Sequence, residues 1–425
     1  MRKISARRSL PLVAMLLLVS AAFPFSRPTA ANNRVQAIPD QYIVVFKDSV
    51  SDPVGKARGL ANARGLSLLY TYEHALKGFA GVVPASQLDA LKADPDVAYI
   101  QQDEVVSLGD FVAQARPGGS PAKQTLPTGI DRIDGELSDT VSGNGSGSVD
   151  VDVAVIDTGI DIDHPDLNVV GGKNCSTGAS YDDGNGHGTH VAGTIAAKDD
   201  ASGVVGVAPG ARLWAVRVLN HAGSGSWSSV ACGVDWVTEN AGTIEVANMS
   251  LGGSGSEPSE GGCSTGDALH DAICTSVGAG VTYAVAAGNS SADAEGFVPA
   301  AYDEVITVSA LADFDGKSGG LGSPTCRDDE DDTFANFSNF GADVDIIAPG
   351  VCINSTWKGG GYNTISGTSM ASPHVAGAAA LYKASNSTAS PEQVKTALQN
   401  AGTTDWTNSD DNDGTKEKLL NVDAF

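Results

Sequence analysis

Short apolar runs alternate with amphipathic stretches along most of the chain, and their spacing separates a small first part from a large second part. In the first part the pattern predicts strands at 41–46, 77–83 and 97–100 and helices at 53–65 and 85–93. Two helices packed on a small antiparallel sheet would form an α+β unit. We therefore predict a compact first domain at about 41–108.

The second part has the rhythm of strand, helix and strand that is typical of a parallel sheet. It predicts strands at 151–156, 213–218, 246–249, 281–286 and 305–308, with helices at 191–197, 227–240 and 266–277. Such repeats form an open, mostly parallel sheet with helices on both faces, so the predicted fold class is α/β. In these folds the functional side chains follow the carboxyl ends of the strands.

Between the two parts, residues 109–124 include the run Arg-Pro-Gly-Gly-Ser-Pro, which is typical of a flexible linker. We expect the domains to divide at 32–115 and 116–425.

The first 31 residues have the layout of a secretory signal peptide. Four basic residues within the first eight precede an apolar run at 10–19, and small residues follow at 29–31. A membrane anchor is the alternative, but the run is shorter than the roughly 20 residues that a spanning helix needs. The pair Arg7-Arg8 leaves twin-arginine export open beside ordinary secretion. We expect an extracellular protein with no membrane attachment after cleavage.

The composition is acidic, with 26 Lys and Arg against 51 Asp and Glu and a net charge of −25 over 425 residues. Basic residues cluster only in the first ten positions, which argues against a nucleic-acid partner. Because 41% of the residues are hydrophobic, the chain can bury a core and is not disordered throughout.

Six cysteines lie in the second part, and none is spaced as Cys-x-x-Cys. An even number in an exported chain favours disulfides, for which six cysteines allow 15 pairings. We predict the pairs Cys263–Cys274 and Cys326–Cys352, with buried thiols as the alternative.

Three polar segments carry candidate chemistry. Asp157 ends the first predicted strand of the second part, His187 begins a helix, and Ser369 begins another. A serine becomes a nucleophile when an imidazole takes its proton and a carboxylate orients that imidazole. The developing oxyanion needs fixed donors, which the Asn289 side chain and the Ser369 backbone N–H could supply.

Five segments in this part resemble the subtilisin-like serine proteases (subtilases), near the proteinase K and aqualysin branch. They are 155–160, 187–193, 250–253, 286–289 and 367–377. The resemblance implies Ser369 as nucleophile, His187 as general base, Asp157 as the residue that orients it, and Asn289 as oxyanion donor. It also implies an inhibitory propeptide in the first domain, autoprocessing, protein substrates of broad range, a monomer, and no cofactor for the chemistry.

The same resemblance assigns two segments to substrate binding. After a buried strand, the backbone of Ser250, Leu251 and Gly252 could pair with an extended peptide as an added strand. The resemblance places this segment in the primary specificity pocket together with Ala286, Ala287 and Gly288. An ordinary glycine-rich loop is the alternative.

Several neighbouring residues compete for these roles. The alternatives to the proposed aspartate and serine are Asp161, Asp163, Asp166 and Ser372. His190 and His374 are expected to be packing residues, although a zinc site with His187 is conceivable; the glutamate of a HExxH motif is absent there. A catalytically silent peptide-binding protein and a metallohydrolase also stay open as functions.

Two acidic runs, 328–332 and 410–413, invite a calcium interpretation, since calcium prefers six to eight oxygen ligands. Neither matches an EF-hand loop, because Leu420 stands where the second run would need glutamate. Runs of acid are usually solvated surface. The resemblance favours a structural calcium ion, with its ligands unassigned.

Overall fold

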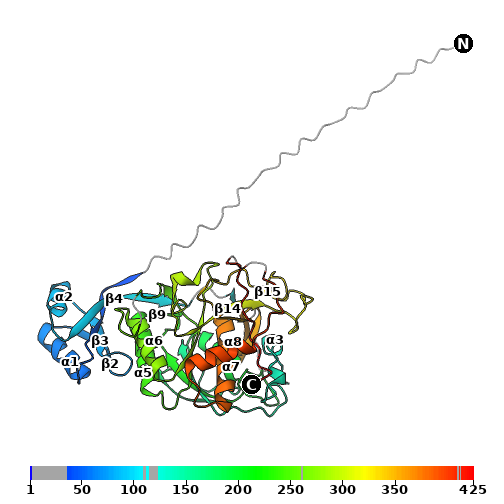
Figure 1. The fold of residues 1–425 in the computed structure, drawn as a ribbon, viewed down its shortest axis with the longest axis horizontal. Helices are drawn as coiled ribbons and strands as arrows, with labels where there is room; N and C mark the ends of the chain where they lie inside the picture. The colour runs from blue at the N-terminus through cyan, green and yellow to red at the C-terminus, as the bar shows by residue number, and fades with distance from the viewer. Residues whose placement is uncertain (2–35, 109–111, 114–122, 260–261, 409–410, 412) are drawn as a thin grey trace. The chain divides into compact units, whose positions relative to one another are not determined.

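The computed structural model describes Met1 and residues 36–108, 112–113, 123–259, 262–408, 411 and 413–425 (Figure 1). Apart from Met1, the predicted signal peptide lies outside these residues, as does most of the predicted linker. Among the helices that are described, none is long and apolar enough to cross a membrane.

The first domain is an antiparallel sheet with two helices on one face. Its elements are β1 (Ala37–Phe46), α1 (Pro53–Arg64), β2 (Ser67–Tyr72), β3 (Gly78–Val82), α2 (Ala85–Lys92) and β4 (Val97–Ser107). The sheet order is β2-β3-β1-β4, and each neighbouring pair is antiparallel. The expected α+β unit is confirmed, with β2 as a strand that the sequence pattern did not predict.

Alternation along β1 explains how this sheet packs. Val44 and Phe46 enter a core that includes Leu60 of α1 and Leu91 of α2. Ile43 and Val45, which alternate with them along the strand, enter a second core, formed largely by the other domain. Because successive side chains point to opposite faces of a strand, one strand serves both cores.

The second domain is built on a mostly parallel sheet. Its strands are β5 (Val112–Ala113), β6 (Asp152–Asp157), β7 (Val169–Asn174), β8 (Arg212–Arg217), β9 (Ser224–Ser226), β10 (Val246–Met249), β11 (Gly253–Ser254), β12 (Thr282–Ala286), β13 (Phe297–Val298), β14 (Ile306–Ala312), β15 (Thr333–Phe334), β16 (Ile346–Pro349), β17 (Ile353–Trp357) and β18 (Gly361–Ser366). The main sheet runs β15-β14-β12-β10-β6-β8-β7, with β16 also paired to β14. Only β15 is antiparallel to its neighbour in this sheet.

Helices cover both faces of the main sheet, as the sequence predicted (Figure 1). They are α3 (Thr128–Arg132), α4 (His187–Ala196), α5 (Trp227–Glu239), α6 (Ala268–Gly278), α7 (Thr368–Ser385) and α8 (Pro391–Ala401). Val153 and Val155 of β6 pack with α4, α7 and α8, whereas Ala154 and Ile156 pack with α5 and α6. Burial on both faces explains why β6 reads as a continuous apolar run.

Three neighbouring parallel strands direct the candidate segments to one edge. β6, β10 and β12 are adjacent and end at Asp157, Met249 and Ala286. Because the carboxyl ends of parallel strands lie at the same edge, the segments that follow them meet there.

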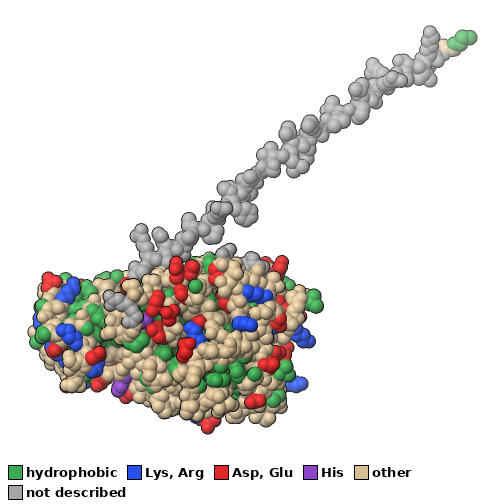
Figure 2. Space-filling model, viewed as in Figure 1, with side chains coloured by type: hydrophobic (Ala, Val, Ile, Leu, Met, Phe, Trp, Pro, Cys, Tyr) green, Lys and Arg blue, Asp and Glu red, His purple; other side chains and the backbone are tan. Residues whose placement is uncertain are grey.

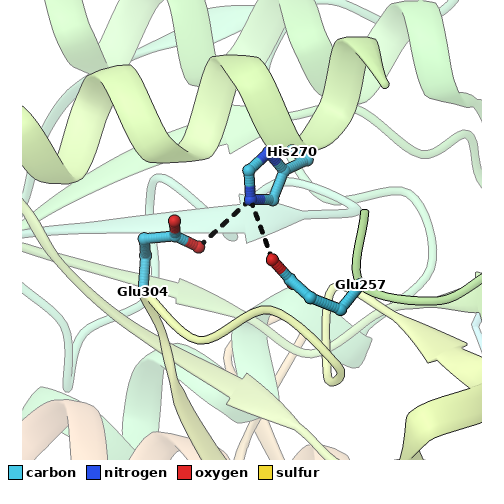
Figure 3. A group of neighbouring side chains, drawn as sticks. All are labelled: Glu257, His270 and Glu304. Atoms are coloured by element: carbon cyan, nitrogen blue, oxygen red, sulfur yellow. Dashed lines mark ion pairs between the residues drawn. The ribbon is translucent and has the colours of Figure 1, made fainter. Parts of the chain in front are cut away.

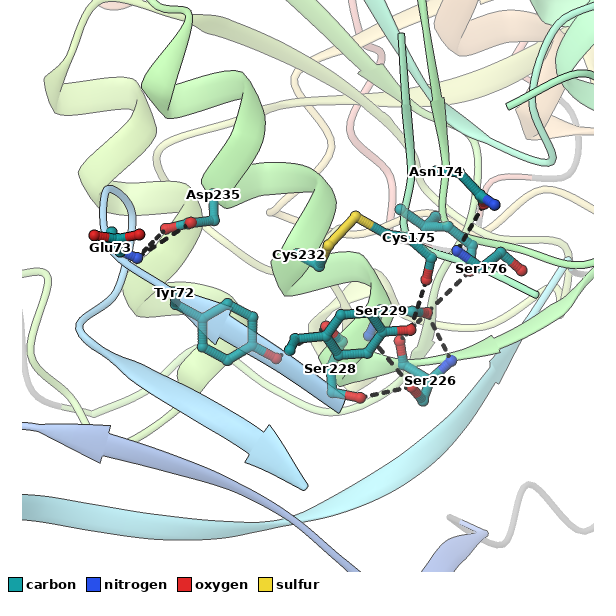
Figure 4. The surroundings of a disulfide bond; sticks show 12 residues. Tyr72, Glu73, Asn174, Cys175, Ser176, Ser226, Ser228, Ser229, Cys232 and Asp235 are labelled. Carbon is teal, nitrogen blue, oxygen red and sulfur yellow. Dashed lines mark hydrogen bonds between the residues drawn. A yellow bond between two sulfur atoms is a disulfide. The ribbon is translucent and has the colours of Figure 1, made fainter. Parts of the chain in front are cut away.

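All six cysteines are paired. The predicted disulfides Cys263–Cys274 and Cys326–Cys352 are confirmed, and the third bond joins Cys175 to Cys232 (Figure 4). The buried-thiol alternative is therefore wrong. The third bond ties the residue after β7 to α5, which packs against the first domain.

The acidic composition is visible at the surface. On the face shown in Figure 2, Asp and Glu side chains gather over the upper middle of the molecule, whereas Lys and Arg side chains are scattered. That the chain has no nucleic-acid partner stays a prediction.

Candidate active site

The Asp157 carboxylate and the His187 imidazole are in direct contact beneath the surface. His187 Nδ1 lies 2.9 Å from both carboxylate oxygens, and neither side chain is exposed. The backbone N–H of Thr158 also donates to Asp157 Oδ1, at 2.7 Å. A carboxylate on Nδ1 fixes the tautomer that carries hydrogen there and leaves Nε2 as the basic atom.

A buried aspartate, Asp183, shapes the turn that leads into His187. Its carboxylate accepts hydrogen bonds from the backbone of Asn185 and Gly186 and from the hydroxyl groups of Thr158 and Thr189. Burial raises the pKa of Asp183 above its ordinary value, and the hydrogen bonds from Thr189, Gly186 and Asn185 offset only part of that rise. The sequence analysis missed this positioning residue, although an acid four residues before the histidine in a glycine-rich turn is a usable signal.

Ser369 occupies the first turn of α7, beside the segment that follows β10. Its hydroxyl donates to the Ser250 carbonyl at 3.3 Å, and the Ser250 hydroxyl donates to the Ser369 carbonyl at 3.0 Å. Unpaired backbone N–H groups and the helix dipole favour negative charge at this end of a helix. The position therefore suits a reaction in which oxygen becomes an anion.

Packing of α4 on α7 aligns the two helices that begin at His187 and Ser369. A methyl group added to Gly377 of α7 would lie 3.2 Å from the Ile195 carbonyl of α4. Gly377 follows Ser369, and Ile195 follows His187, by the same number of residues. Both helices begin at the edge where the parallel strands end, so their first residues face the same region.

Asn289 follows β12 and is held by the residue before the serine. Its Oδ1 accepts hydrogen bonds from the Thr368 backbone and hydroxyl, both at 2.8 Å. A methyl group placed on Gly367 would lie 3.4 Å from Asn289 Nδ2 and 3.7 Å from the Ser369 backbone nitrogen. Asn289 Nδ2 and the Ser369 backbone N–H, the two predicted oxyanion donors, therefore border the same small space.

Comparison with known proteins agrees with this geometry. A family model described as the subtilase family matches residues 148–419, and one described as peptidase inhibitor I9 matches residues 41–109. The chain belongs to the subtilase family.

Known relatives match between about two thirds and nine tenths of this chain. Alkaline serine exoprotease A of Vibrio alginolyticus is 39% identical over 404 residues, which are 90% of this chain and 67% of that protein. Subtilisin DY of Bacillus licheniformis is 42% identical over 307 residues, 71% of this chain and 98% of the relative. The crystal structure of a cold adapted subtilisin-like serine proteinase aligns with a TM-score of 0.56 at 38% identity, covering 69% of this chain and 97% of that one.

These matches establish a serine-type endopeptidase made with an inhibitory propeptide. The narrower placement near proteinase K stays a prediction.

The propeptide of this subtilase lies along the candidate substrate edge. Residues 105–107 of β4 pair antiparallel with β9, and Ser107 forms a β-bridge with Gly252. Farther along the chain, Val112 pairs with Ser366, close to the serine. Ser107 of the propeptide therefore occupies the Gly252 backbone, one of the positions predicted from the sequence to pair with an extended substrate.

Helix α5 anchors the propeptide through its polar groups. The Asp235 carboxylate accepts hydrogen bonds from the backbone N–H groups of Glu73, His74 and Ala75, and the Tyr72 hydroxyl donates to the Ser228 carbonyl (Figure 4). These buried and partly buried contacts bind the inhibitor domain directly to the catalytic domain.

The alternative catalytic serine and histidines have structural partners. Ser372 is fully buried and donates to Asn248 Oδ1 at 2.6 Å. His190 Nε2 donates to the Ile353 and Asn363 carbonyls, and burial lowers its pKa to about 3. Burial likewise lowers the pKa of His374 to about 4. Both histidines are neutral packing residues, as expected.

The alternative aspartates also lie in other networks. Asp161 accepts hydrogen bonds from the Gly359 and Gly360 backbone, Asp166 accepts one from the Tyr362 hydroxyl, and Asp163 is exposed. The structure thus favours Asp157 as the partner of the imidazole.

Among the substrate residues predicted from the sequence, the Ser250 side chain is directed inward. Its hydroxyl contacts Asn248 and the Ser369 carbonyl, so only its backbone is available to a substrate. Leu251 and Ala287 are also buried, while Gly252 and Gly288 are partly exposed. Asn339, which the sequence analysis missed, holds the Ala286–Gly288 turn by donating to the Ala287 carbonyl.

Each acidic run contributes to a group of carboxylates able to hold a cation, and for the first run that group is Asp313, Asp315 and Asp331. In the first, Asp332 is paired with Arg132 and Asp329 with Arg327, so these two carboxylates already have cationic partners. Near the second, Asp411 and Asp413 lie close to the buried Glu417 in a group able to hold a cation. Asp410 lies outside the described residues.

Proposed function

We propose that this subtilase is a secreted endopeptidase of broad protein specificity, which uses Ser369, His187 and Asp157 as its catalytic residues. The observation that carries the proposal is the buried Asp157–His187 contact at the edge where α7 begins. Secretion agrees with the N-terminal sequence and with three disulfides, which persist in oxidising compartments.

In the proposed reaction, Ser369 Oγ attacks the scissile carbonyl and its proton passes to His187 Nε2. Asp157 stabilises the resulting imidazolium. The oxyanion accepts hydrogen bonds from Asn289 Nδ2 and the Ser369 backbone N–H. His187 then protonates the leaving amine, which gives an acyl-enzyme; water, deprotonated by the same imidazole, releases the acid. Only protein groups and water take part.

The maturation cut falls between Ser107 and Val112 in this proposal. Residues on either side of that interval pair with the two sides of the candidate site, Ser107 with Gly252 and Val112 with Ser366. The cut would then lie before residue 115, where the sequence analysis ended the propeptide.

A pair of inhibitors tests the proposed function. A sulfonyl fluoride that acylates serine nucleophiles should abolish casein hydrolysis by the mature protein. A chelator, added with the temperature held well below unfolding, should leave most activity. The opposite pattern would identify a metallohydrolase and contradict the proposal.

We propose a structural calcium ion at Asp411, Asp413 and Glu417. The three residues offer oxygen ligands within 4.8 Å of one another, the donor type that calcium prefers. Glu417 is 5% exposed, and neither of its carboxylate oxygens has a hydrogen-bond partner within the described part of the chain. A bound cation would satisfy this buried carboxylate.

The calcium proposal predicts a pH dependence of stability. Burial, with the nearby Asp411 and Asp413, raises the pKa of Glu417 to about 8. Without calcium, the protonated Glu417 carboxyl therefore contributes its full stabilisation below the ordinary pKa of glutamate. That stabilisation is lost as pH rises through about 8. Calcium favours the charged form and should remove that loss, on the order of a few kcal/mol.

This effect is measured by melting temperatures between about pH 4 and 9, with chelator or with calcium. That is roughly the pH range over which carboxyl groups with shifted pKa values titrate. Glu417→Gln should lose both the calcium response and the associated pH dependence, whereas the exposed Glu239→Gln should keep them. An unchanged calcium response in Glu417→Gln would contradict the assignment.

A further inference from the structure

A group of possible metal ligands that includes a histidine lies on the face of the sheet covered by α6. It consists of His270 in α6, Glu257 in the loop after β11, and Glu304 just before β14 (Figure 3). His270 Nε2 lies 3.3 Å from Glu257 Oε1 and 3.3 Å from Glu304 Oε2. The His270 side chain is 1% exposed, while the two glutamates are 33% and 24% exposed.

These contacts do not satisfy the imidazole as hydrogen bonds. Within the described chain, His270 Nε2 has no hydrogen-bond partner, and the same holds for Glu257 Oε2 and Glu304 Oε2. Zinc binds imidazole nitrogen and carboxylate oxygen at about 2.0–2.1 Å, so two ligand atoms of a tetrahedral site lie about 3.3–3.4 Å apart. Both measured nitrogen–oxygen distances agree with that separation.

The other side of the imidazole faces groups that would orient a metal ligand. His270 Nδ1 lies 3.4 Å from Thr265 Oγ1 and 3.6 Å from Asp271 Oδ1. The Asp271 carboxylate is itself fixed by donors from Thr265 and from the propeptide residue Tyr99. Histidines that bind metals commonly have a carboxylate or another acceptor at the second ring nitrogen.

The electrostatic environment favours a cation at this position. Three carboxylates surround the buried His270 ring, those of Glu257 and Glu304 at 3.3 Å from Nε2 and that of Asp271 at 3.6 Å from Nδ1. The carboxylates therefore attract positive charge strongly, and either a proton on Nε2 or a metal ion among the three ligands can provide it. A buried nitrogen donor disfavours calcium, which prefers oxygen, and favours a transition metal.

We propose that His270 Nε2, Glu257 and Glu304 bind one divalent transition-metal ion of the zinc type, with water completing the coordination. The site contains none of the proposed catalytic residues and none of the proposed calcium ligands. It would join the loop after the substrate segment 250–252 to α6 and to the start of β14. Its expected role is to stabilise that loop.

Direct metal binding tests this proposal. The full chain carrying Ser369→Ala, which prevents self-digestion, is dialysed against micromolar zinc with excess calcium to occupy oxygen-only sites, and bound zinc is counted by mass spectrometry. His270→Gln and Glu257→Gln in that background should each bind one zinc fewer per chain. His221→Gln, at an exposed histidine, should bind as much as the parent.

Two further measurements keep the test decisive. Cobalt(II) in place of zinc should give the visible absorption of a tetrahedral site in the parent and not in Glu257→Gln. This variant changes a partly exposed position that tolerates substitution, so it keeps the test valid if His270→Gln fails to fold. Zinc should also raise the melting temperature of the parent and of His221→Gln only. Equal zinc content in parent and Glu257→Gln would show that the group is only an ion pair around a protonated imidazole.

Discussion

Replacing Ser369 with alanine is expected to lower kcat for peptide hydrolysis by about 10⁶-fold, the loss measured when the nucleophile is removed from subtilisin. Without Oγ no acyl-enzyme can form, and only substrate binding and the oxyanion donors remain. The same change should leave the secreted chain as an uncut precursor, whereas the parent should yield a mature N-terminus that begins between Leu108 and Val112.

Ser372→Ala is the matched control, because this serine lies one turn farther along α7 and is fully buried. It should lose the hydrogen bond to Asn248 and some stability, yet mature and hydrolyse casein within about tenfold of the parent. Electrophoresis of culture supernatant and a casein assay separate the two variants. Normal maturation of Ser369→Ala would contradict the assignment of the nucleophile.

Asp157→Asn should lower kcat by about 10⁴-fold, as the equivalent change does in a serine protease of another fold. The amide is nearly isosteric, so its hydrogen bonds to the Thr158 backbone and to His187 Nδ1 can persist. However, an amide can donate hydrogen to Nδ1 and so favour the tautomer in which Nε2 carries the proton. His187 then cannot accept the proton of Ser369.

Asp163→Asn, at the exposed alternative aspartate, provides the comparison for charge removal in the same loop region. Its kcat should stay within about twofold of the parent, since surface substitutions have small effects. Steady-state kinetics on a chromogenic peptide measure both variants. If Asp163→Asn were the impaired protein and Asp157→Asn the active one, the orienting carboxylate would be wrongly assigned.

The fold could be predicted largely because its strands are buried on both faces. Continuous apolar runs such as the one in β6 identify parallel strands, and helical stretches between them imply crossovers. By contrast, β2 was missed because its residues are mostly exposed or only partly buried, so it lacks a strong apolar signal.

Within the site, the residues with short local motifs were found from the sequence, while those that act through distant contacts were not. Asn339 stabilises the turn before Asn289 from the segment between β15 and β16. Glu257, His270 and Glu304 come together only when three separate elements pack. Glu417 was also missed, because its importance arises from burial beside Asp411 and Asp413 rather than from its spacing.

Mapping a covalent adduct tests the central assignment most directly. The mature protein is treated with a fluorophosphonate, digested and sequenced by mass spectrometry. The proposed geometry predicts a single adduct on Ser369, the hydroxyl that His187 activates. An adduct on Ser372, or a protein that digests casein while Ser369 stays unmodified at full reagent exposure, would contradict it.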